Sequence, residues 1–289
     1  MKYLAENRFK NILVPIDGST SCLRARELTA IIARKFNSKI TLVHVVSHDF
    51  MHPELKANYQ LPPEIMQKMD AVYMKAGEKI LRTAEEVFKE EGLQVEPILI
   101  RRAEDPADSI LNLSKERSFD LIIMGNRAET HAERFELGST SEKIALYSKI
   151  PVLIVKKKTK LGKILVAIDG SKQATKALGY VSVIARKFNS KVTLLHVAEA
   201  KLANLEPEAV RSISEKILWD AATEIKGIEI DKKLEFGSPA ESIIRLARQE
   251  DYDLIVLGSR GLSSVKRYLL GSVSEDVTWH ARRSVLIVR

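Results

Sequence analysis

A glycine-rich stretch in the last part of the chain has the spacing of a phosphate-binding loop. It runs Gly258-Ser-Arg-Gly261, then nine residues, then Gly271-Ser272. Gly258 and Gly261 permit a positive φ and a close approach of a ligand to the main chain, so that successive amides can face an anion. Ser272 is expected to open a helix, where free N–H groups and the helix dipole favour a phosphate. An ordinary turn and helix cap is the alternative, with Glu275 folded back as a capping box.

Two aspartates and two histidines stand at the ends of apolar runs. Asp169 follows the run 164–168, and Asp17 follows the corresponding run 12–16. A carboxylate directly after a buried strand lies where the ligand crevice of an open α/β sheet begins, and it suits a ribose diol. A helix-capping aspartate is the alternative. His44 and His196 recur too, but a histidine in an apolar strand is more often a satisfied core residue than a ligand.

We expect no metal site built from side chains. Cys22 is the only cysteine, so an internal disulfide and a thiolate cluster are both excluded. His48 and His52 are spaced for one helical face, but Pro53 and the lack of nearby acids argue against a metal site.

The segments that carry these residues occur twice. Asn11-Ile-Leu-Val-Pro-Ile-Asp-Gly-Ser19 returns 152 residues later as Lys163-Ile-Leu-Val-Ala-Ile-Asp-Gly-Ser171. Phe119-Asp-Leu-Ile-Ile-Met-Gly125 returns after only 133 residues as Tyr252-Asp-Leu-Ile-Val-Leu-Gly258. The first copy therefore holds 19 extra residues, 152 minus 133, and they lie after its second strand. We expect two domains, at 1–157 and 158–289.

Each copy alternates short apolar strands with helices. The first copy's strands are predicted at 12–16, 40–46, 97–100, 121–124 and 152–155. They lack polar alternation, which indicates burial on both faces. Asp105-Pro106 and Ser238-Pro-Ala-Glu241 predict helix starts, because a capping side chain precedes a proline in each. Such alternation gives a doubly wound, Rossmann-like α/β fold with helices on both faces of a parallel sheet.

Composition places the chain in the soluble globular class, with 45% hydrophobic and 29% charged residues. No apolar run reaches membrane-spanning length and the first residues lack a signal-like core, so we expect a cytoplasmic protein. The formal net charge is +8, but positions 156–163 alone supply five lysines and no acid. We interpret this run as a solvated linker rather than a nucleic-acid or membrane-binding patch.

Taken together, these patterns resemble the universal stress protein (UspA-like) family in a tandem two-domain form. The spacing Gly-x2-Gly-x9-Gly-Ser after such a strand is the signature of the ATP-binding members. The similarity also covers Ala167-Ile-Asp169-Gly-Ser171, His196-Val197 and Ser284-Val-Leu-Ile-Val288. It implies a five-stranded sheet in the order 3-2-1-4-5 in each copy, an adenine nucleotide across the strand ends, and a role in the stress response.

The resemblance implies a nucleotide site in each copy, holding ATP or AMP with Mg²⁺ bound through the phosphates. Asp169 would hold the ribose hydroxyls, the main chain near Val197 the adenine edge, and the glycine loop the phosphates. The second-copy candidates are Ala167, Ile168, Asp169, His196, Val197, Gly258, Ser259, Arg260, Gly261, Gly271, Ser272, Val273 and Ser274. The first-copy candidates are Asp17, Val45, Gly125, Arg127, Gly138, Ser139 and Thr140.

The first copy departs from the loop pattern at Ala128, which replaces the middle glycine. If a positive φ is required there, alanine costs about 1–2 kcal/mol. Its loop also carries three glutamates, where the second copy has Lys266 and Arg267; they are Glu129, Glu133 and Glu136. We therefore expect unequal sites, the first binding more weakly or only through adenosine.

A regulatory nucleotide-binding module is the favoured function, with no catalytic residue assigned. The alternative is a slow ATPase or an autophosphorylating enzyme, in which serines near the phosphates accept the group: Ser263, Ser264, Ser272 and Ser274. No positioned base accompanies these serines, so we expect little turnover of ATP.

The last strand of each copy, 152–155 and 285–288, is short, apolar and at a sheet edge, which proteins normally cover. We therefore expect the two copies to pair through these strands as an intramolecular pseudo-dimer. A further homodimer of whole chains is left open.

Overall fold

A computed structural model describes residues 8–47, 62–103, 105–126, 137–157, 160–200, 205–261 and 270–289. Its first half contains β1 Asn11–Pro15, α2 Thr20–Phe36, β2 Lys39–Ser47, α4 Pro63–Glu90, β3 Val95–Ala103, α5 Pro106–Glu116, β4 Leu121–Gly125, α6 Ser139–Tyr147 and β5 Val152–Val155. Its second half contains β6 Lys163–Ala167, α7 Lys172–Phe188, β7 Lys191–Ala198, α9 Pro207–Glu224, β8 Ile230–Phe236, α10 Pro239–Gln249, β9 Leu254–Gly258, α11 Ser272–His280 and β10 Ser284–Val288.

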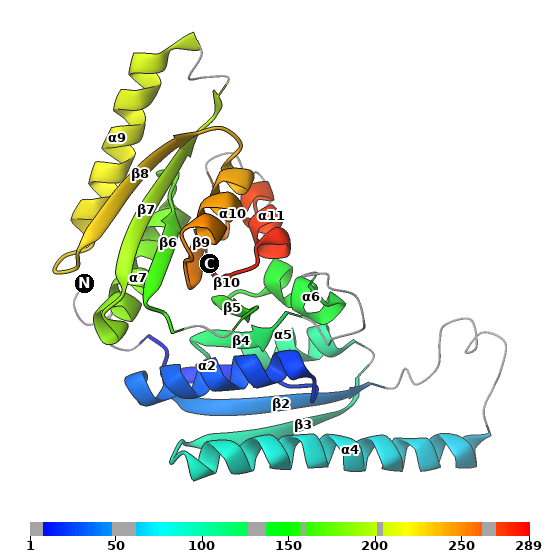
Figure 1. The fold of residues 1–289 in the computed structure, drawn as a ribbon. Helices are drawn as coiled ribbons and strands as arrows, with labels where there is room; N and C mark the ends of the chain where they lie inside the picture. Colours follow the sequence, from blue (N-terminus) through cyan, green and yellow to red (C-terminus); the bar gives the residue numbers. More distant parts are fainter. Residues whose placement is uncertain are drawn as a thin grey trace.

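One ten-stranded sheet runs through the molecule in the order β3-β2-β1-β4-β5-β10-β9-β6-β7-β8 (Figure 1). Strands within each half are parallel, and each half has the predicted order 3-2-1-4-5. The two halves join where β10 pairs with β5 in antiparallel register, with Leu286 opposite Leu153. The predicted pairing of the last strands is therefore confirmed.

Helices cover both faces of this sheet because successive strand residues point to opposite sides. Ile12 and Val14 of β1 belong to the core under α2, α4, α7 and α9, whereas Leu13 belongs to the core under α5, α6, α10 and α11. All three side chains are fully buried, as expected for strands that lack polar alternation.

The helix starts follow the local sequence, although the capping bonds differ. Asp105 caps α5 through its carboxylate, which accepts hydrogen bonds from Ala107 N and Asp108 N. Ser238 precedes α10 as predicted, but its side chain makes no capping bond. Ser272 opens α11 after Gly271, and no side-chain cap is formed there either, so the capping-box alternative for Glu275 is wrong.

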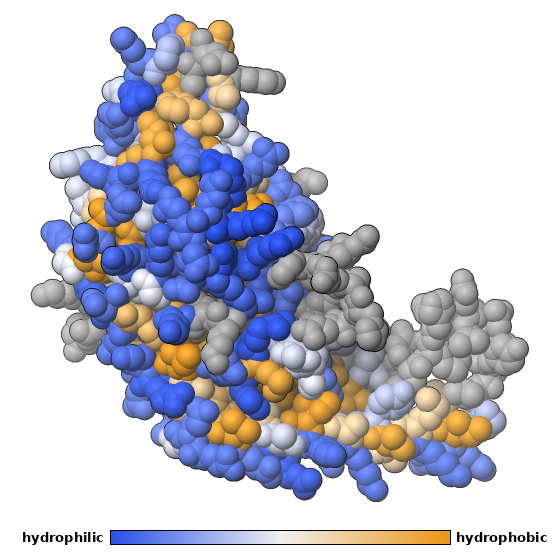
Figure 2. All heavy atoms as spheres, viewed as in Figure 1, coloured by the Kyte–Doolittle hydropathy of each residue, from blue (hydrophilic) through white to orange (hydrophobic). Residues whose placement is uncertain are grey.

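The extra residues of the first copy lengthen one helix. α4 has 28 residues where its counterpart α9 has 18. Figure 1 shows α4 running past the ends of the neighbouring strands, and Figure 2 shows apolar surface over that part of the helix. Its exposed apolar side chains are Ile65, Met66, Val72 and Tyr73. None of the described helices is long and apolar enough to cross a membrane.

An aromatic cluster joins the halves on the α2 and α7 face. Phe36 of α2 lies 6.3 Å from Phe188 of α7, measured between ring centroids. Phe9 lies 5.0 Å from Phe36 and 5.7 Å from Tyr180 in the second half. Phe9 and Phe36 belong to one continuous buried core, and the partly buried Tyr180 and Phe188 pack against it, so neither half has a closed core of its own.

The lysine-rich segment between the halves is only partly the solvated linker that the sequence predicts, since Lys160 is exposed but both ends of the segment are packed against the protein. Lys156 is 3% exposed and Leu161 is 1% exposed. The Lys163 ammonium donates to Glu250 O at 2.8 Å and stacks over Tyr252. The prediction was wrong here because the partners of these lysines come from distant parts of the chain and leave no local pattern.

Candidate functional site

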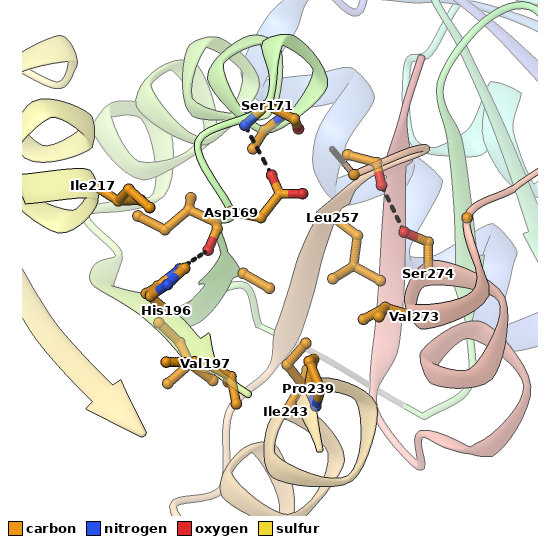
Figure 3. A pocket seen from close by; sticks show the side chains of 18 of the residues that line it. Asp169, Ser171, His196, Val197, Ile217, Pro239, Ile243, Leu257, Val273 and Ser274 are labelled. Atoms are coloured by element: carbon orange, nitrogen blue, oxygen red, sulfur yellow. Dashed lines mark hydrogen bonds between the residues drawn. The ribbon is translucent and has the colours of Figure 1, made fainter. Parts of the chain in front are cut away.

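A cavity of about 670 Å³ opens at the carboxyl ends of β6, β7 and β9 in the second half. Figure 3 shows Asp169 at its centre, with Val197 and Ile243 below and Ser274 across from it. The predicted residues that line it are Ala167, Ile168, Asp169, His196, Val197, Gly258, Arg260, Gly261, Gly271, Ser272, Val273 and Ser274. The structure therefore brings together twelve of the thirteen second-copy candidates.

Ser259 is the exception. It is 1% exposed and does not line the cavity. Its amide donates to Val288 O at 2.7 Å, and its carbonyl accepts from Gly271 N at 2.8 Å. Both main-chain groups are used to hold the loop, so Ser259 is a brace beneath the site and not part of its wall.

Two hydrogen bonds of the loop frame recur in both halves. In the second half, the Ser274 hydroxyl donates to Gly258 O at 2.7 Å, which ties the first turn of α11 to the end of β9. In the first half, Ser141 donates to Gly125 O at 3.0 Å. Gly138 N donates to Asn126 O at 2.7 Å, as Gly271 N does to Ser259 O. Each copy thus presents the amino end of a helix beside the fourth strand.

Gly258 and Gly261 are required for the close approach of neighbouring atoms and not for a positive φ, which corrects the sequence-based reason. None of Gly258, Gly261 and Gly271 has a positive φ. A Cβ on Gly258 would lie 2.8 Å from Ala174 N, and a Cβ on Gly261 would overlap Asp169 Oδ2. A Cβ on Gly271 would approach nothing closer than 3.5 Å.

Asp169 turns its carboxylate into the cavity instead of capping a helix. Its Oδ1 accepts a hydrogen bond from Ser171 N at 2.9 Å. The residue before α7 is Ser171, whose hydroxyl accepts from Ala174 N at 3.2 Å. The capping role is therefore filled by Ser171, and the helix-cap alternative for Asp169 is wrong.

Both histidines have a hydrogen-bond partner, as predicted, although they are partly buried and not in the core. His196 Nδ1 lies 2.8 Å from Ile168 O, and His44 Nδ1 lies 2.7 Å from Ile16 O. Each ring thereby holds the carbonyl that precedes the site aspartate. His196 also forms part of the cavity wall.

Positive charge gathers at the loop side of the cavity. Arg260 lines it. Burial and the charge of Arg260 lower the pKa of Arg289 to about 10. Within the described residues, no cluster of histidine, cysteine, aspartate and glutamate could hold a metal ion. The arrangement favours an anion held by amides and arginine.

Sequence reasoning missed the wall contributed by α9 and α10. Val210, Ile213 and Ile217 of α9 line the cavity, and Pro239 and Ile243 of α10 lie opposite (Figure 3). The first three lie three and four residues apart on one helical face, a spacing that also fits an ordinary core face. Only the crossing of α9 over β7 turns them toward the cavity.

A second cavity of about 530 Å³ occupies the corresponding place in the first half. Its wall includes the predicted residues Asp17, Val45, Gly125, Gly138, Ser139 and Thr140. No described residue of α4 lines it. A Cβ on Gly77 would lie 2.8 Å from His44 Cδ2, so α4 crosses close above β2 at this glycine.

Several predicted residues lie outside the described part of the chain. They are Arg127, Ala128, Glu129, Glu133 and Glu136 of the first loop, Ser263, Ser264, Lys266 and Arg267 of the second, and His48 and His52.

Cys22 distinguishes the first cavity from the second. Its thiol donates to Asp17 Oδ1 at 2.8 Å, and Ser19 N donates to the same oxygen at 2.9 Å. Burial favours a higher pKa for Asp17, but these hydrogen bonds outweigh it and the pKa lies below its ordinary value. At the equivalent position the second copy has Ala174, whose side chain has no hydrogen-bond donor for Asp169.

The Cys22 thiol is expected to react slowly. Burial and the charge of Asp17 raise its pKa to about 11. At pH 8 the thiolate should be about a hundredfold or more scarcer than in an unfolded chain, since an ordinary thiol has a pKa near 8.5. Iodoacetamide labelling followed by mass spectrometry should show that ratio between native and urea-unfolded protein, and Asp17→Asn should speed the native reaction. Equal rates in native and unfolded protein would contradict this.

The chain matches the model of the Universal stress protein family twice, over residues 8–156 and 160–289. A putative universal stress protein of Staphylococcus haemolyticus is 34% identical over 137 residues, covering 44% of this chain and 83% of that protein. One from Methanocaldococcus jannaschii is 28% identical over 156 residues, covering 54% of this chain and 86% of its own. The crystal structure of a universal stress protein from Archaeoglobus fulgidus has a TM-score of 0.72 at 24% identity, covering 97% of this chain and 98% of that one. The similarity to this crystal structure shows that the two proteins share a fold.

Proposed function

Because the chain belongs to the universal stress protein family, we propose that it is a regulatory module of the stress response that binds an adenine nucleotide, ATP or AMP, at the strand ends. One observation carries the proposal. In a single cavity of about 670 Å³, an inward-facing carboxylate at Asp169 stands beside a braced loop and the start of α11. That volume lies within the range of roughly 300–1,000 Å³ typical of ligand pockets.

The cavity offers a separate environment for each part of the nucleotide. Asp169 would accept hydrogen bonds from the ribose hydroxyls. The adenine ring would lie between Val197 and Ile243, which provide an apolar slot with main-chain groups at its edge. The amides at Ser272 and Val273 begin a helix, which favours the phosphates, and Arg260 adds positive charge. Mg²⁺ would be held through the phosphates.

The two sites are proposed to be unequal. The first cavity is smaller, and its aspartate already accepts a hydrogen bond from the Cys22 thiol. A ribose hydroxyl would have to compete with that thiol at Asp17. Because the second cavity is larger and its wall includes the positive charge of Arg260, the second site is proposed as the stronger one, and the first as a weaker or adenosine-only site.

Regulation, in the cytoplasm, is proposed in preference to catalysis. Phosphoryl transfer needs a positioned base or nucleophile beside the phosphates. In the described wall, the Ser274 hydroxyl donates to Gly258 O, and His196 Nδ1 is engaged with Ile168 O. Both groups serve the frame of the site.

Isothermal titration calorimetry with adenosine, AMP, ADP and ATP tests the proposal on the full chain. We expect Asp169→Ala to weaken the stronger site by about tenfold to hundredfold, because hydrogen bonds to a charged group contribute roughly 1.5–3 kcal/mol. The matched variant Asp17→Ala should leave that site unchanged.

No heat with any adenine nucleotide would overturn the binding proposal. Phosphate release from ATP at about 1 per second or faster in the same samples would overturn the regulatory role.

A further inference from the structure

Lys156 belongs to the first half but is buried against a helix of the second. It follows β5 directly and is 3% exposed. Its ammonium donates to Thr278 O at 2.6 Å, to Ala281 O at 2.7 Å and to Trp279 O at 3.2 Å. These carbonyls form the carboxyl end of α11, where the last carbonyls of a helix have no partner inside it.

The second half makes the reciprocal contact. Arg289 follows β10 directly, and its guanidinium donates to Ala145 O near the end of α6. Arg289 is Lys156 displaced by 133 residues, and Thr278 is Ala145 displaced by the same 133 residues. The contact is therefore a repeated feature of the two copies. Each copy ends in a cation that reaches across the β5–β10 seam.

The two helices held in this way are α6 and α11, whose amino ends line the candidate phosphate sites. α6 begins at Ser139 and α11 at Ser272, and each has nine residues. A helix of that length is only about 13 Å long, so a contact that fixes its last turn also fixes its first. Burial lowers the pKa of Lys156 to about 7, so the three hydrogen bonds to the carbonyls hold the helix end, and the protonated fraction of the side chain also complements the helix dipole.

The amino ends of the helices also interact. Burial and the charges of Asp276 and Glu142 raise the pKa of Glu275, and Glu142 lies in the first turn of α6. On the other side of the second loop, the charge of Arg260 acts on Arg289, which holds α6. Arg260 in the wall of the second cavity therefore lies close enough to Arg289 for the two positive charges to affect each other.

We propose that Lys156 is a positioning residue for the phosphate site of the second half, and that Arg289 positions the corresponding helix of the first. This rests on the proposed function as far as the ligand is concerned. Lys156 touches no part of the nucleotide and acts through α11. The consequence is that each half completes the phosphate site of the other across the seam.

A purely structural role for Lys156 would weaken all ligands alike, so the test compares ligands with and without phosphates. Adenosine and ATP are titrated into Lys156→Met in an Asp17→Ala background, which reports on the second site. We expect ATP affinity to fall about threefold to tenfold, the range of a charge at a helix end, while adenosine affinity stays within about twofold.

Two further variants sharpen the comparison. Lys156→Arg should keep the ATP affinity of the unsubstituted residue, because an arginine at position 289 makes the equivalent contact with α6. Lys157→Met is the matched control, since the neighbouring Lys157 pairs with Asp251 and not with α11. Should Lys156→Met not fold, Lys156→Gln retains two N–H donors without the charge and takes its place. Equal losses for adenosine and ATP, or a loss in Lys157→Met as large as in Lys156→Met, would overturn the proposal.

Hydrogen exchange gives a readout that needs no ligand. Lys156→Met should raise amide exchange in α11 about tenfold while leaving α10 unchanged. If wild-type protein binds neither adenosine nor ATP, the proposed function fails, and exchange in α11 alone decides whether Lys156 positions the helix. Unchanged exchange in α11 would overturn the positioning role itself.

Discussion

Phe36→Ala should lower the free energy of unfolding by about 3–5 kcal/mol, the usual cost of truncating a buried phenylalanine. The loss should reach both halves, because Phe36 is 5% exposed and lies between Phe9 and Phe188 on the seam. Both tryptophans, Trp219 and Trp279, are in the second half. Tryptophan fluorescence during urea unfolding therefore reports on the second half, whereas the Phe36→Ala substitution lies in the first.

The matched control is Phe88→Ala. Phe88 is a fully buried residue near the carboxyl end of α4, which packs on β2 and β3 of the first half, away from the seam. Its removal costs a ring of the same size, so the additional shift of the tryptophan transition in Phe36→Ala measures the contribution of the seam. The halves would unfold independently if Phe36→Ala left the tryptophan transition unchanged and produced a separate loss of circular dichroism at lower urea concentration.

Gly261→Ala should weaken ATP binding by about tenfold to hundredfold while leaving the fold almost as stable. The added methyl group would overlap Asp169 Oδ2, which is the far end of a side chain and can turn away. A displaced carboxylate loses its hydrogen bonds to the ribose, and such bonds to a charged group are worth roughly 1.5–3 kcal/mol. Calorimetry measures the binding and thermal unfolding the stability.

Two comparisons test the reason as well as the size of this effect. Gly271→Ala places a methyl group no closer than 3.5 Å to its neighbours and should lose much less affinity. In an Asp169→Ala background, Gly261→Ala should cost little more, because the two substitutions act on the same interaction. Additive losses would mean that Gly261 acts on the phosphates directly and not through Asp169.

The sequence by itself determined the elements and their repetition. Apolar runs without polar alternation predicted the bounds of β1, β2, β4 and β5 in the first half to within a residue or two, because a strand that is buried on both faces is apolar at nearly every position. The third strand is longer than predicted, at Val95–Ala103. It lies at the edge of the sheet, where fewer of its residues are buried and the apolar pattern is weaker.

The sequence also located most of the second site, since strand ends and glycine spacing are local features. Asp169 and the loop glycines meet in one cavity as expected. The reason for the glycines was nevertheless different from the predicted one. A positive φ can be inferred from a turn pattern, whereas the approach of Gly258 to Ala174 or of Gly261 to Asp169 depends on how far apart two elements pack.

Only the tertiary structure decided which residues of distant segments meet. Lys156 lies 122 positions from Thr278, and no periodicity within a run of five lysines distinguishes the one that is buried. The tertiary structure also revealed the hydrogen bond from the Cys22 thiol to Asp17 and the α9 residues that line the larger cavity. Local patterns specify which helices and strands form, because each residue contributes its own conformational preference. Contacts across the seam depend on how the two folded halves pack against each other, which involves residues from the whole chain.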